Sequence, residues 1–492
     1  MPMQSRTDQV HSYQFFLQRV VSGLVARESD PAELPFRRLG WSAFGGFMIA
    51  VLVAAGFGVY GLLVGGGATG WQDGGSVIVE KGSETAYIYR NERLHPMVNI
   101  VSAQLALGGD AGVTRVSARS LAGVPRGLTL GIPGAPDGLP AGGSLLTGGW
   151  TLCTQQRPDG SGGSETFSVL AVGQPPAGGQ PVADRAVLVR DAGAGGGGDA
   201  GDDVDVGLHL VWHGHRFEVD ARALRALGTG QQRTLPVAPA WLDTLPVGDP
   251  LAPGQEPDRG QPTRALGELR SDLGVRTGQV LESAGLHYLV GLDRLREITP
   301  LSARILLNDP ATGDAYPDGE PDLRTDLPDG ALNNAHIDLL PGRAATSPPE
   351  QPPELVALAP EDLPVAPVCA GFAPGGFTPE IWSGARLPWQ AGGITTPQRT
   401  GSGGLLADQV LVEGGRAALV RAVPAPDAPG GTWHLVTDQG IQFRLSAPEV
   451  AGMLGYRVDA AVPIAAGLLA RLPAGPALDP AQADQPVPLV NG

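Results

Sequence analysis

Residues 94–108, LHPMVNIVSAQLALG, have the pattern of a short strand, a turn and the start of a helix. A similar pattern returns three more times. Residues 236–251 (PVAPAWLDTLPVGDPL) align without a gap with residues 463–478 (PIAAGLLARLPAGPAL), and residues 96–107 align with residues 296–307. We interpret each occurrence as a repeat made of a β-hairpin, a capped helix and an exit rich in Pro and Gly. One such unit cannot bury its own apolar face, so the four repeats are expected to pair or stack.

Helix-capping residues recur at matching positions of the repeats. Asn99 and Thr299 align with each other, and Pro300 occupies the first helical position, where a missing N–H is tolerated. Ser446 and Glu449 have the spacing of a capping box. These residues predict that a helix begins at the same place in each repeat.

An uncharged segment, residues 41–64, precedes the repeats. As a helix it would span about 36 Å, which exceeds the ~30 Å of a hydrocarbon core. We therefore predict one transmembrane helix. Arg37 and Arg38 adjoin its amino-terminal end, which predicts a cytoplasmic amino terminus and an extracytoplasmic carboxyl terminus.

The predicted span carries small residues at a spacing of four, which would let another helix approach closely. An alternative is that Gly and Ala are simply common in this chain. The predicted packing stripe consists of Gly46, Ala50, Ala54 and Gly58.

The segment before the span predicts an amphipathic helix, because its apolar residues recur at steps of three and four. An arm of about 40 residues makes no core of its own, so its apolar face needs a partner protein or the membrane surface. A protein partner is favoured, because basic and acidic residues in the arm nearly balance. The predicted docking face consists of Val10, Tyr13, Leu17, Val20 and Leu24.

The chain has two cysteines, Cys153 and Cys369, and both follow the predicted span. Outside the membrane an even pair is typical of a disulfide, and two free thiols are the alternative. The bond would close a loop of about 217 residues, worth about 5 kcal/mol in the chain-entropy model.

Two β-rich stretches lie between the repeats. The first covers residues 145–154, 165–172 and 185–191, and the second covers residues 407–423, where Gly414-Gly415 suits a tight hairpin turn. One cysteine lies near each stretch. A disulfide between them predicts one central sheet domain, with the second and third repeats inserted between its halves.

The sequence thus predicts an α+β chain with a β-rich central domain and four repeats outside the membrane. The predicted ranges are a cytoplasmic arm (1–40), a transmembrane helix (41–64), a linker (65–84), repeat one (85–130), the first half of the central β domain (131–190), a Gly/Asp-rich linker (191–206), repeat two (207–255), repeat three with an acidic loop (256–340), a Pro-rich crossing with the second half of the central domain (341–425), and repeat four with the tail (426–492).

Charge and motifs argue against several functions. The net charge of -16 disfavours nucleic acid as a partner. The one lysine, Lys81, is not part of a Gly-Lys-Ser/Thr loop, and H-E-x-x-H and G-x-S-x-G are absent. We therefore expect no catalytic site and no cofactor, and we interpret His95 as a strand-end residue.

Two further patterns are weak candidates for metal sites. His209, His213 and His215 could hold zinc on a regular strand, but Gly214 has the position of a hairpin turn. The glycine run at 193–198 and the aspartates that follow it lack the spacing of a nucleotide or calcium site. We predict that the histidines belong to a hairpin and that the glycine run is a linker.

Several motifs together resemble the EccB family, a membrane component of actinobacterial type VII secretion systems. The resemblance covers nearly the whole chain. The motifs are Thr7-x-Gln9-Val10-x-x-Tyr13-x-Phe15, Leu94-His95-Pro96 with Asn99, Ser102-Ala103 and Leu105, the stretch GIPGAPDGLP at 131–140, and Trp150-x-x-Cys153. The long acidic and Gly/Pro loops at 191–203 and 309–330 depart from the family pattern.

The resemblance implies a non-enzymatic core subunit of a membrane-spanning export machine. Implied partners are a multi-span channel-like subunit, an FtsK/SpoIIIE-type ATPase, other core subunits, a mycosin-like protease, further copies of the chain and the lipid bilayer. Two alternatives are a membrane-anchored cell-wall-binding repeat protein and an anchored hydrolase of unrecognised type.

Overall fold

The structure is a computed structural model, and it divides the chain into two compact units. One unit comprises residues 1–95 and 112–127, and the other comprises residues 96–111 and 128–492. The described residues are 6–26, 35–64, 70–109, 111–158, 160, 163–193, 207–228, 234–267, 272–356, 366–385, 393–426 and 428–488.

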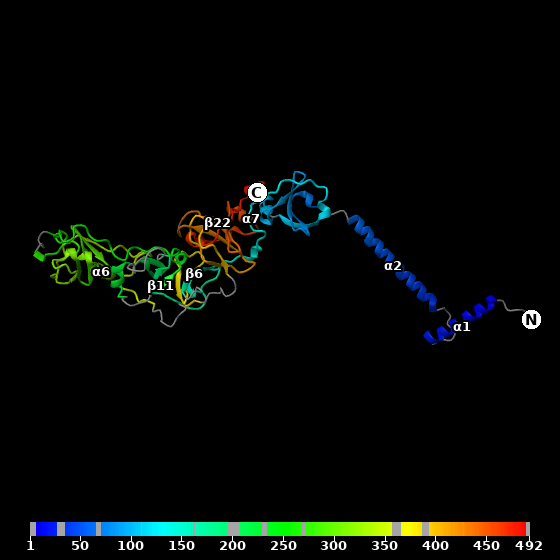
Figure 1. The fold of residues 1–492 in the computed structure, drawn as a ribbon, viewed down its shortest axis with the longest axis horizontal. Coiled ribbons are helices and arrows are strands. Elements are labelled where there is room, and N and C mark those ends of the chain that lie inside the picture. The colour runs from blue at the N-terminus through cyan, green and yellow to red at the C-terminus, as the bar shows by residue number, and fades with distance from the viewer. Residues whose placement is uncertain are drawn as a thin grey trace, which may run out of the picture. The chain divides into compact units, whose positions relative to one another are not determined.

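Two long helices come first in the chain. α1 spans Arg6–Ala26 and α2 spans Pro35–Val64 (Figure 1). Within α2, Gly40–Val59 is long and apolar enough to cross a membrane, and none of it is buried by the rest of the described chain. Contact between so much apolar surface and water is unfavourable, so this helix is suited to lipid.

Four sheets among the described residues repeat one strand order. The first three strands form a meander, and the fourth returns parallel to the first. The third sheet carries one extra strand, β16, beside its β14. The strands are β1 (Ser76–Lys81), β2 (Ala86–Arg90), β3 (Arg93–Met97) and β4 (Gly112–Ser117); β8 (Val187–Asp191), β9 (Leu208–Trp212), β10 (His215–Glu218) and β11 (Leu235–Val237); β12 (Val280–Ser283), β13 (Leu286–Val290), β14 (Leu295–Ile298), β15 (Leu323–Arg324) and β16 (Ile337–Asp338); and β21 (Ala418–Val423), β22 (Thr432–Val436), β23 (Gln442–Arg444) and β24 (Val462–Ala465).

One helix connects the third strand to the fourth in each of these sheets, because parallel strands need a crossover. These helices are α3 (Ile100–Ala106), α4 (Ala221–Ala226), α6 (Pro300–Leu307) and α7 (Glu449–Met453). Asn99 caps α3 and Thr299 caps α6, each by accepting from the backbone N–H three residues on. Shorter helices are α5 (Pro239–Leu242), α8 (Ala466–Leu469) and α9 (Pro480–Ala483).

The predicted boundaries of the first, second and fourth repeats are wrong at their first strands, whereas the first strand of the third repeat, β12, lies inside its predicted range 256–340. β1 lies inside the predicted linker 65–84, β8 lies almost wholly inside the predicted first half of the central domain, and β21 lies inside its second half. The cause is that the first strand of each of these three sheets precedes the hairpin that the alignment detected. Short apolar strands carry no signal of the sheet that they join.

The expectation of a β-hairpin closed by Gly414-Gly415 is also wrong. It does not close a hairpin, because β20 (Gln409–Leu411) before it belongs to the central sheet, whereas β21 after it belongs to the fourth repeated sheet. A turn sequence fixes the local backbone but not whether the flanking strands pair with each other.

The central sheet has seven described strands in the order β19-β20-β6-β5-β17-β18-β7. Its other members are β5 (Trp150–Pro158), β6 (Ser164–Ala171), β7 (Gln180–Pro181), β17 (Val368–Phe372), β18 (Glu380–Ser383) and β19 (Ile394–Thr395). The second and third repeated sheets lie in the chain between β7 and β17, which is the nested topology expected from the sequence.

One hydrophobic cluster joins the central sheet to the second and fourth repeats. Leu152 of β5 shares this cluster with Val189 and Trp241 of the second repeat and with Val420 and Leu468 of the fourth, and all five are at most 1% exposed. Burial of this much apolar surface makes the central sheet the common core of these elements.

Candidate functional site: anchor, disulfide and paired repeats

The predicted docking face of α1 is exposed. Its five side chains are between 42% and 79% exposed, with Leu24 the most exposed. Phe15, which lies on the opposite side of the helix at 100° per residue, is also 62% exposed. The apolar surface of α1 is therefore wider than the predicted face, and docking through it stays a prediction.

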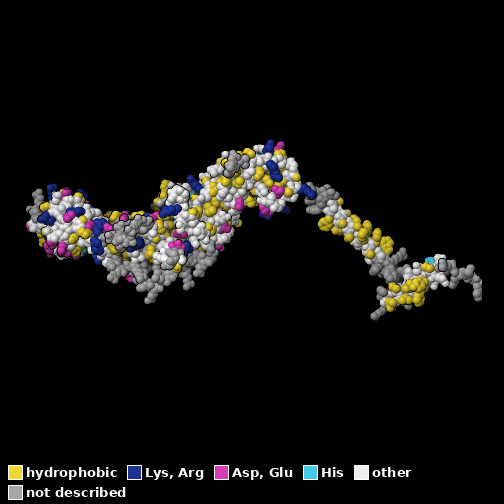
Figure 2. Space-filling view, viewed as in Figure 1, with side chains coloured by type: hydrophobic (Ala, Val, Ile, Leu, Met, Phe, Trp, Pro, Cys, Tyr) yellow, Lys and Arg dark blue, Asp and Glu magenta, His cyan; other side chains and the backbone are white. Residues whose placement is uncertain are grey.

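The small-residue stripe on α2 is exposed as well. A methyl group added at Gly46 or Gly58 would meet no atom within 4 Å among the described residues. Figure 2 shows yellow apolar side chains along this helix. The surface is open to another helix or to lipid, and packing through the stripe stays a prediction.

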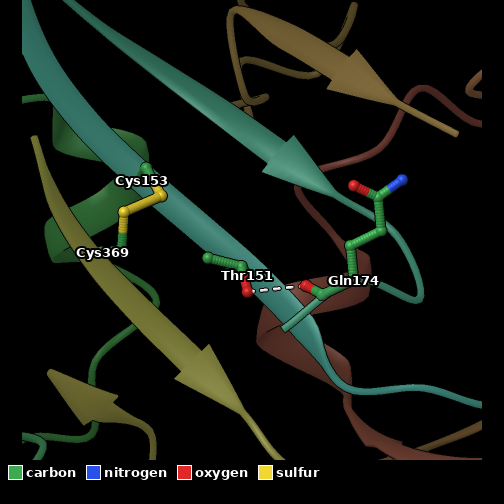
Figure 3. Close-up of a disulfide and its surroundings, with 4 residues drawn as sticks. All are labelled: Thr151, Cys153, Gln174 and Cys369. Atoms are coloured by element: carbon green, nitrogen blue, oxygen red, sulfur yellow. Dashed lines mark hydrogen bonds between the residues drawn. A yellow bond between two sulfur atoms is a disulfide. The ribbon is translucent and has the colours of Figure 1, made fainter. Parts of the chain in front are cut away.

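The disulfide expected from the sequence is present, and it joins Cys153 on β5 to Cys369 on β17 (Figure 3). The two residues lie directly opposite each other in the antiparallel pair, with their Cα atoms 3.9 Å apart. Both are fully buried, and 216 residues of sequence separate them. Two residues along β5, the Thr151 hydroxyl donates to the Gln174 carbonyl over 2.7 Å (Figure 3). The bond therefore links the two halves of the central sheet across the inserted repeats.

A polar clamp holds the start of α3. The Asn99 side chain accepts from the Ser102 N–H (2.8 Å) and donates to the Ile132 carbonyl (2.9 Å), and the Ser102 hydroxyl accepts from the Ile132 N–H (2.9 Å). All these contacts are buried. The clamp explains why Asn99, Ser102 and the stretch at 131–140 occur together.

The helix of the first repeat packs against the fourth repeat. Val101 and Leu105 of α3 share a buried cluster with Phe443, Val450 and Leu478. α3 also contacts α7 and α9. The apolar face that α3 cannot bury alone is thus covered by the fourth repeat.

The helices of the second and third repeats pack against each other. Ala223 and Ala226 of α4 share a buried cluster with Leu301 and Ile305 of α6, and the two helices are in contact. The expectation that the repeats pair or stack is met by these helix contacts.

An ionic network reinforces the contact between α4 and the third repeat. Arg222 forms ion pairs with Asp220, the cap of α4, and with Asp309, and Gln255 also donates to Asp309. Burial raises the pKa of both carboxyls, but the hydrogen bonds from Arg222 and from backbone N–H groups outweigh it, so each pKa lies below its usual value. This network could not be predicted from the sequence, because Arg222 and Asp309 have a sequence separation of 87.

A Pro-x-Gly exit pairs with the third strand in three of the four repeats. In the second repeat, the Arg216 N–H donates to the Pro246 carbonyl and the Gly248 N–H donates to the Arg216 carbonyl, both over 2.9 Å. The same pair of bonds joins Leu94 to Pro125 and Gly127, and Gln442 to Pro473 and Gly475. In the third repeat β16 occupies this place.

The glycine of this exit packs directly against the aromatic side chain of a residue in the third strand. A Cβ atom at Gly127, Gly248 or Gly475 would overlap the ring of His95, Phe217 or Phe443, respectively. The alignment placed Gly248 and Gly475 in register, and the ring contact gives the physical reason. His95 is the packed ring of the first repeat, in the strand where the sequence placed it.

Replacing Gly475 with Ala is therefore expected to destabilise the fourth repeat by about 1–3 kcal/mol, because the added methyl overpacks the Phe443 ring. Gly467→Ala is a matched control: it lies in α8 with open space around it, where alanine favours the helix. Urea unfolding of both variants measures the difference. Equal midpoints would show that the ring contact is unimportant.

The three candidate zinc ligands do not converge. His213 lies in the turn between β9 and β10, and its Nε2 contacts Oδ1 of Asp184 at 3.1 Å. The His209 ring contacts the Gly207 carbonyl, and His215 is buried beside the His213 carbonyl. Among the described residues no group of three acidic, histidine or cysteine side chains is placed to hold a metal.

A comparison with known protein families identifies the family of this chain. The family model for the type VII secretion system ESX-1 transport TM domain B matches residues 3–487. The chain belongs to this family.

Curated relatives agree with the family match. The "ESX-3 secretion system ATPase EccB3" of Mycolicibacterium smegmatis is 28% identical over 96% of this chain and 88% of its own length. The protein of the same name from Mycobacterium tuberculosis is 27% identical over the same shares. As an EccB-family member, the chain is a structural core component of a type VII secretion system.

Two solved structures share the fold. One is a chain of an intact ESX-5 inner membrane complex, with a TM-score of 0.59 and 22% identity, covering 100% of this chain and 97% of that one. The other is an EccB3 dimer from an ESX-3 core complex, with a TM-score of 0.59 and 23% identity, covering 83% and 100%. The EccB fold thus accounts for both the anchor and the repeat-built body.

Proposed function

We propose that this EccB-family chain is a non-enzymatic scaffold that connects a membrane complex to an extracytoplasmic body built from paired repeats. The proposal rests on a difference in exposure between the first part of the chain and the rest. One exposed apolar helix and one exposed span precede a body whose described helices α3, α4, α6 and α7 are used in contacts between repeats. Such a body is suited to holding a shape rather than to forming a catalytic cleft.

The orientation is proposed to be amino terminus inside and carboxyl terminus outside. Arg37 and Arg38 before the span favour it, and a buried disulfide suits an oxidising compartment. Because both native cysteines are bonded, one engineered cysteine can report topology. A membrane-impermeant maleimide is expected to label Ser402→Cys on intact cells and to label Gln18→Cys only after permeabilisation. The opposite pattern would overturn the orientation.

The exposed face of α1 is proposed to dock onto the cytoplasmic side of the complex. Proposed partners are a multi-span channel-like subunit, an FtsK/SpoIIIE-type ATPase and other core subunits, with a mycosin-like protease and further copies of the chain on the outer side. The complexes named for the two solved relatives support an assembly of this kind.

Leu17→Glu is expected to reduce recovery of cytoplasmic-side partners at least about tenfold, because it places a charge in an apolar interface. Gln18→Glu is the matched control, since residue 18 lies outside the predicted face and is also exposed to solvent. Quantitative mass spectrometry of tagged full-length chain from membranes measures both. Equal recovery from the two variants would place docking elsewhere.

The absence of enzymatic activity is also a proposal, because the relatives carry "ATPase" in their names. It is supported by the sequence around Lys81, where Glu80 precedes the lysine and no Gly-Lys-Ser/Thr loop exists. Purified full-length chain is expected to release no phosphate from ATP above the level of a mock purification. Hydrolysis that co-elutes with the chain through successive columns would contradict a purely structural role.

A further inference from the structure

The fourth strand of the first repeated sheet, β4, forms an open sheet edge. It spans six residues, Gly112–Ser117, and four of them are exposed. Its only strand partner in the described part of the chain is β1, which lies on one side of it. An edge strand directs half of its N–H and C=O groups away from the sheet, where they can pair with a further strand.

The other sheet edges among the described strands are closed or short. β11 and β24 contain Pro236 and Pro463, and a proline in an edge strand removes an outward N–H. β3, β10 and β23 are bonded to the Pro-x-Gly exits of their repeats. β7, β15, β16 and β19 have two residues each. Of the described edge strands, β4 alone is longer than two residues and has neither a proline nor an exit bonded to it.

The outward backbone groups of β4 belong to Val113, Arg115 and Ser117. The Glu80 N–H donates to the Thr85 carbonyl over 3.0 Å, so the even-numbered residues of β1 bond towards β2 and the odd-numbered ones bond towards β4. Each odd-numbered residue of β1 has an odd-numbered residue of β4 as its register partner. In a parallel ladder a residue bonds to the two neighbours of its register partner, so the partner itself directs its N–H and C=O outward. These outward groups bond to no other described residue.

Basic side chains lie at the carboxyl end of this edge. Lys81 is the register partner of Ser117, and Arg119 follows Ser117 by two residues. Both are exposed, and neither forms an ion pair with another described residue. Arg115 pairs with Glu84 at 3.4 Å, but both side chains are more than half exposed, so water screens that pair. This end of the edge therefore attracts an acidic side chain.

We propose that β4 binds an extended segment of another protein subunit, which adds a fifth strand to the first repeated sheet. Backbone bonds to Val113, Arg115 and Ser117 hold the segment. An acidic side chain of the segment lies near Lys81 and Arg119. A second copy of β4 fits poorly, because the register that pairs all three outward residues sets Arg115 opposite Arg115. This inference rests on the proposed scaffold function, for which it supplies a docking edge.

Photo-crosslinking identifies the occupant. A photoreactive phenylalanine analogue replaces Val113, whose side chain is 48% exposed, in full-length chain in native membranes. The expected product joins the chain to another subunit, at a segment that contains Asp or Glu. The same analogue in place of Val247, 65% exposed in the exit of the second repeat, is the matched control and should not give this product. No product, or a product only with lipid or with a second copy of the chain, would overturn the proposal.

Hydrogen exchange measured by mass spectrometry tests the backbone bonds. It compares full-length chain inside its purified membrane complex with the same chain alone in detergent. The peptide that covers β4 is expected to exchange more slowly in the complex, whereas the peptide that covers β11 should be unchanged because Pro236 interrupts that edge. Equal exchange of β4 in an intact complex would overturn this inference and leave the scaffold function standing. A chain that enters no complex would overturn both.

Variants separate the backbone bonds from the charge. Val113→Pro copies the prolines of β11 and β24, and it is expected to reduce recovery of the crosslinked subunit at least about tenfold. Arg119→Glu, which leaves the strand intact, should reduce recovery severalfold. Arg93→Glu is the matched control, because Arg93 is exposed on β3 at the opposite edge of the same sheet. Wild-type recovery with Arg119→Glu, or an equal loss with Arg93→Glu, would contradict the assignment.

Discussion

Replacing both Cys153 and Cys369 with alanine is expected to lower the free energy of unfolding of the central sheet by about 5 kcal/mol. The bond closes a segment with a sequence separation of 216 residues, and release of so long a loop adds much conformational freedom to the unfolded chain. The second and third repeats lie inside that loop. Their attachment to the central sheet is expected to loosen with it.

Denaturant unfolding of the full-length protein measures this effect, with and without a reductant. Reduced wild type and the double variant are expected to unfold at the same, lower midpoint, and the reductant should not affect the variant. An unchanged midpoint would show that strand pairing alone holds the two halves of the sheet. Labelling of free thiols in the oxidised protein would contradict the disulfide itself.

Arg222→Ala is expected to destabilise the contact between the second and third repeats by about 2 kcal/mol. It leaves Asp309, whose side chain is 9% exposed, without its guanidinium partner. Breaking a fully buried pair costs about 3–5 kcal/mol, but Arg222 is 40% exposed and water screens part of the interaction. Arg225→Ala is the matched control on the same helix, because it removes only an exposed hydrogen bond to the Asn308 carbonyl.

The same pair predicts a dependence on pH. The pKa values of Asp220 and Asp309 are lower in the folded protein than in the unfolded chain, so their stabilisation is present above the unfolded pKa of about 3.9. It is lost as pH falls through the folded values. Unfolding measured between neutral and strongly acidic pH should show a steeper loss in wild type than in Asp309→Asn. Parallel curves would mean that the network contributes little.

The sequence predicted the parts of this fold whose signals are local. An uncharged run is visible wherever it occurs, and Asn99 and Thr299 identify helix starts because capping needs only three residues. The even cysteine pair indicated the link between the two halves of the central sheet. Pairings with distant residues left no comparable signal, which is why β1, β8 and β21 were assigned to the wrong segments and the Arg222 network was not foreseen.

The recurring glycines were only partly predictable from the sequence. Gly248 and Gly475 were found in register, but their role needed the rings of Phe217 and Phe443 in view.

The most direct test of the central claim is the mass and composition of the particle that contains the chain. Tagged full-length protein would be purified from native membranes in mild detergent, weighed by mass photometry, and its companions identified. A scaffold predicts a particle many times the 50.6 kDa of one chain, containing a multi-span subunit and an FtsK/SpoIIIE-type ATPase. A particle of one or two chains without other subunits would contradict the scaffold function.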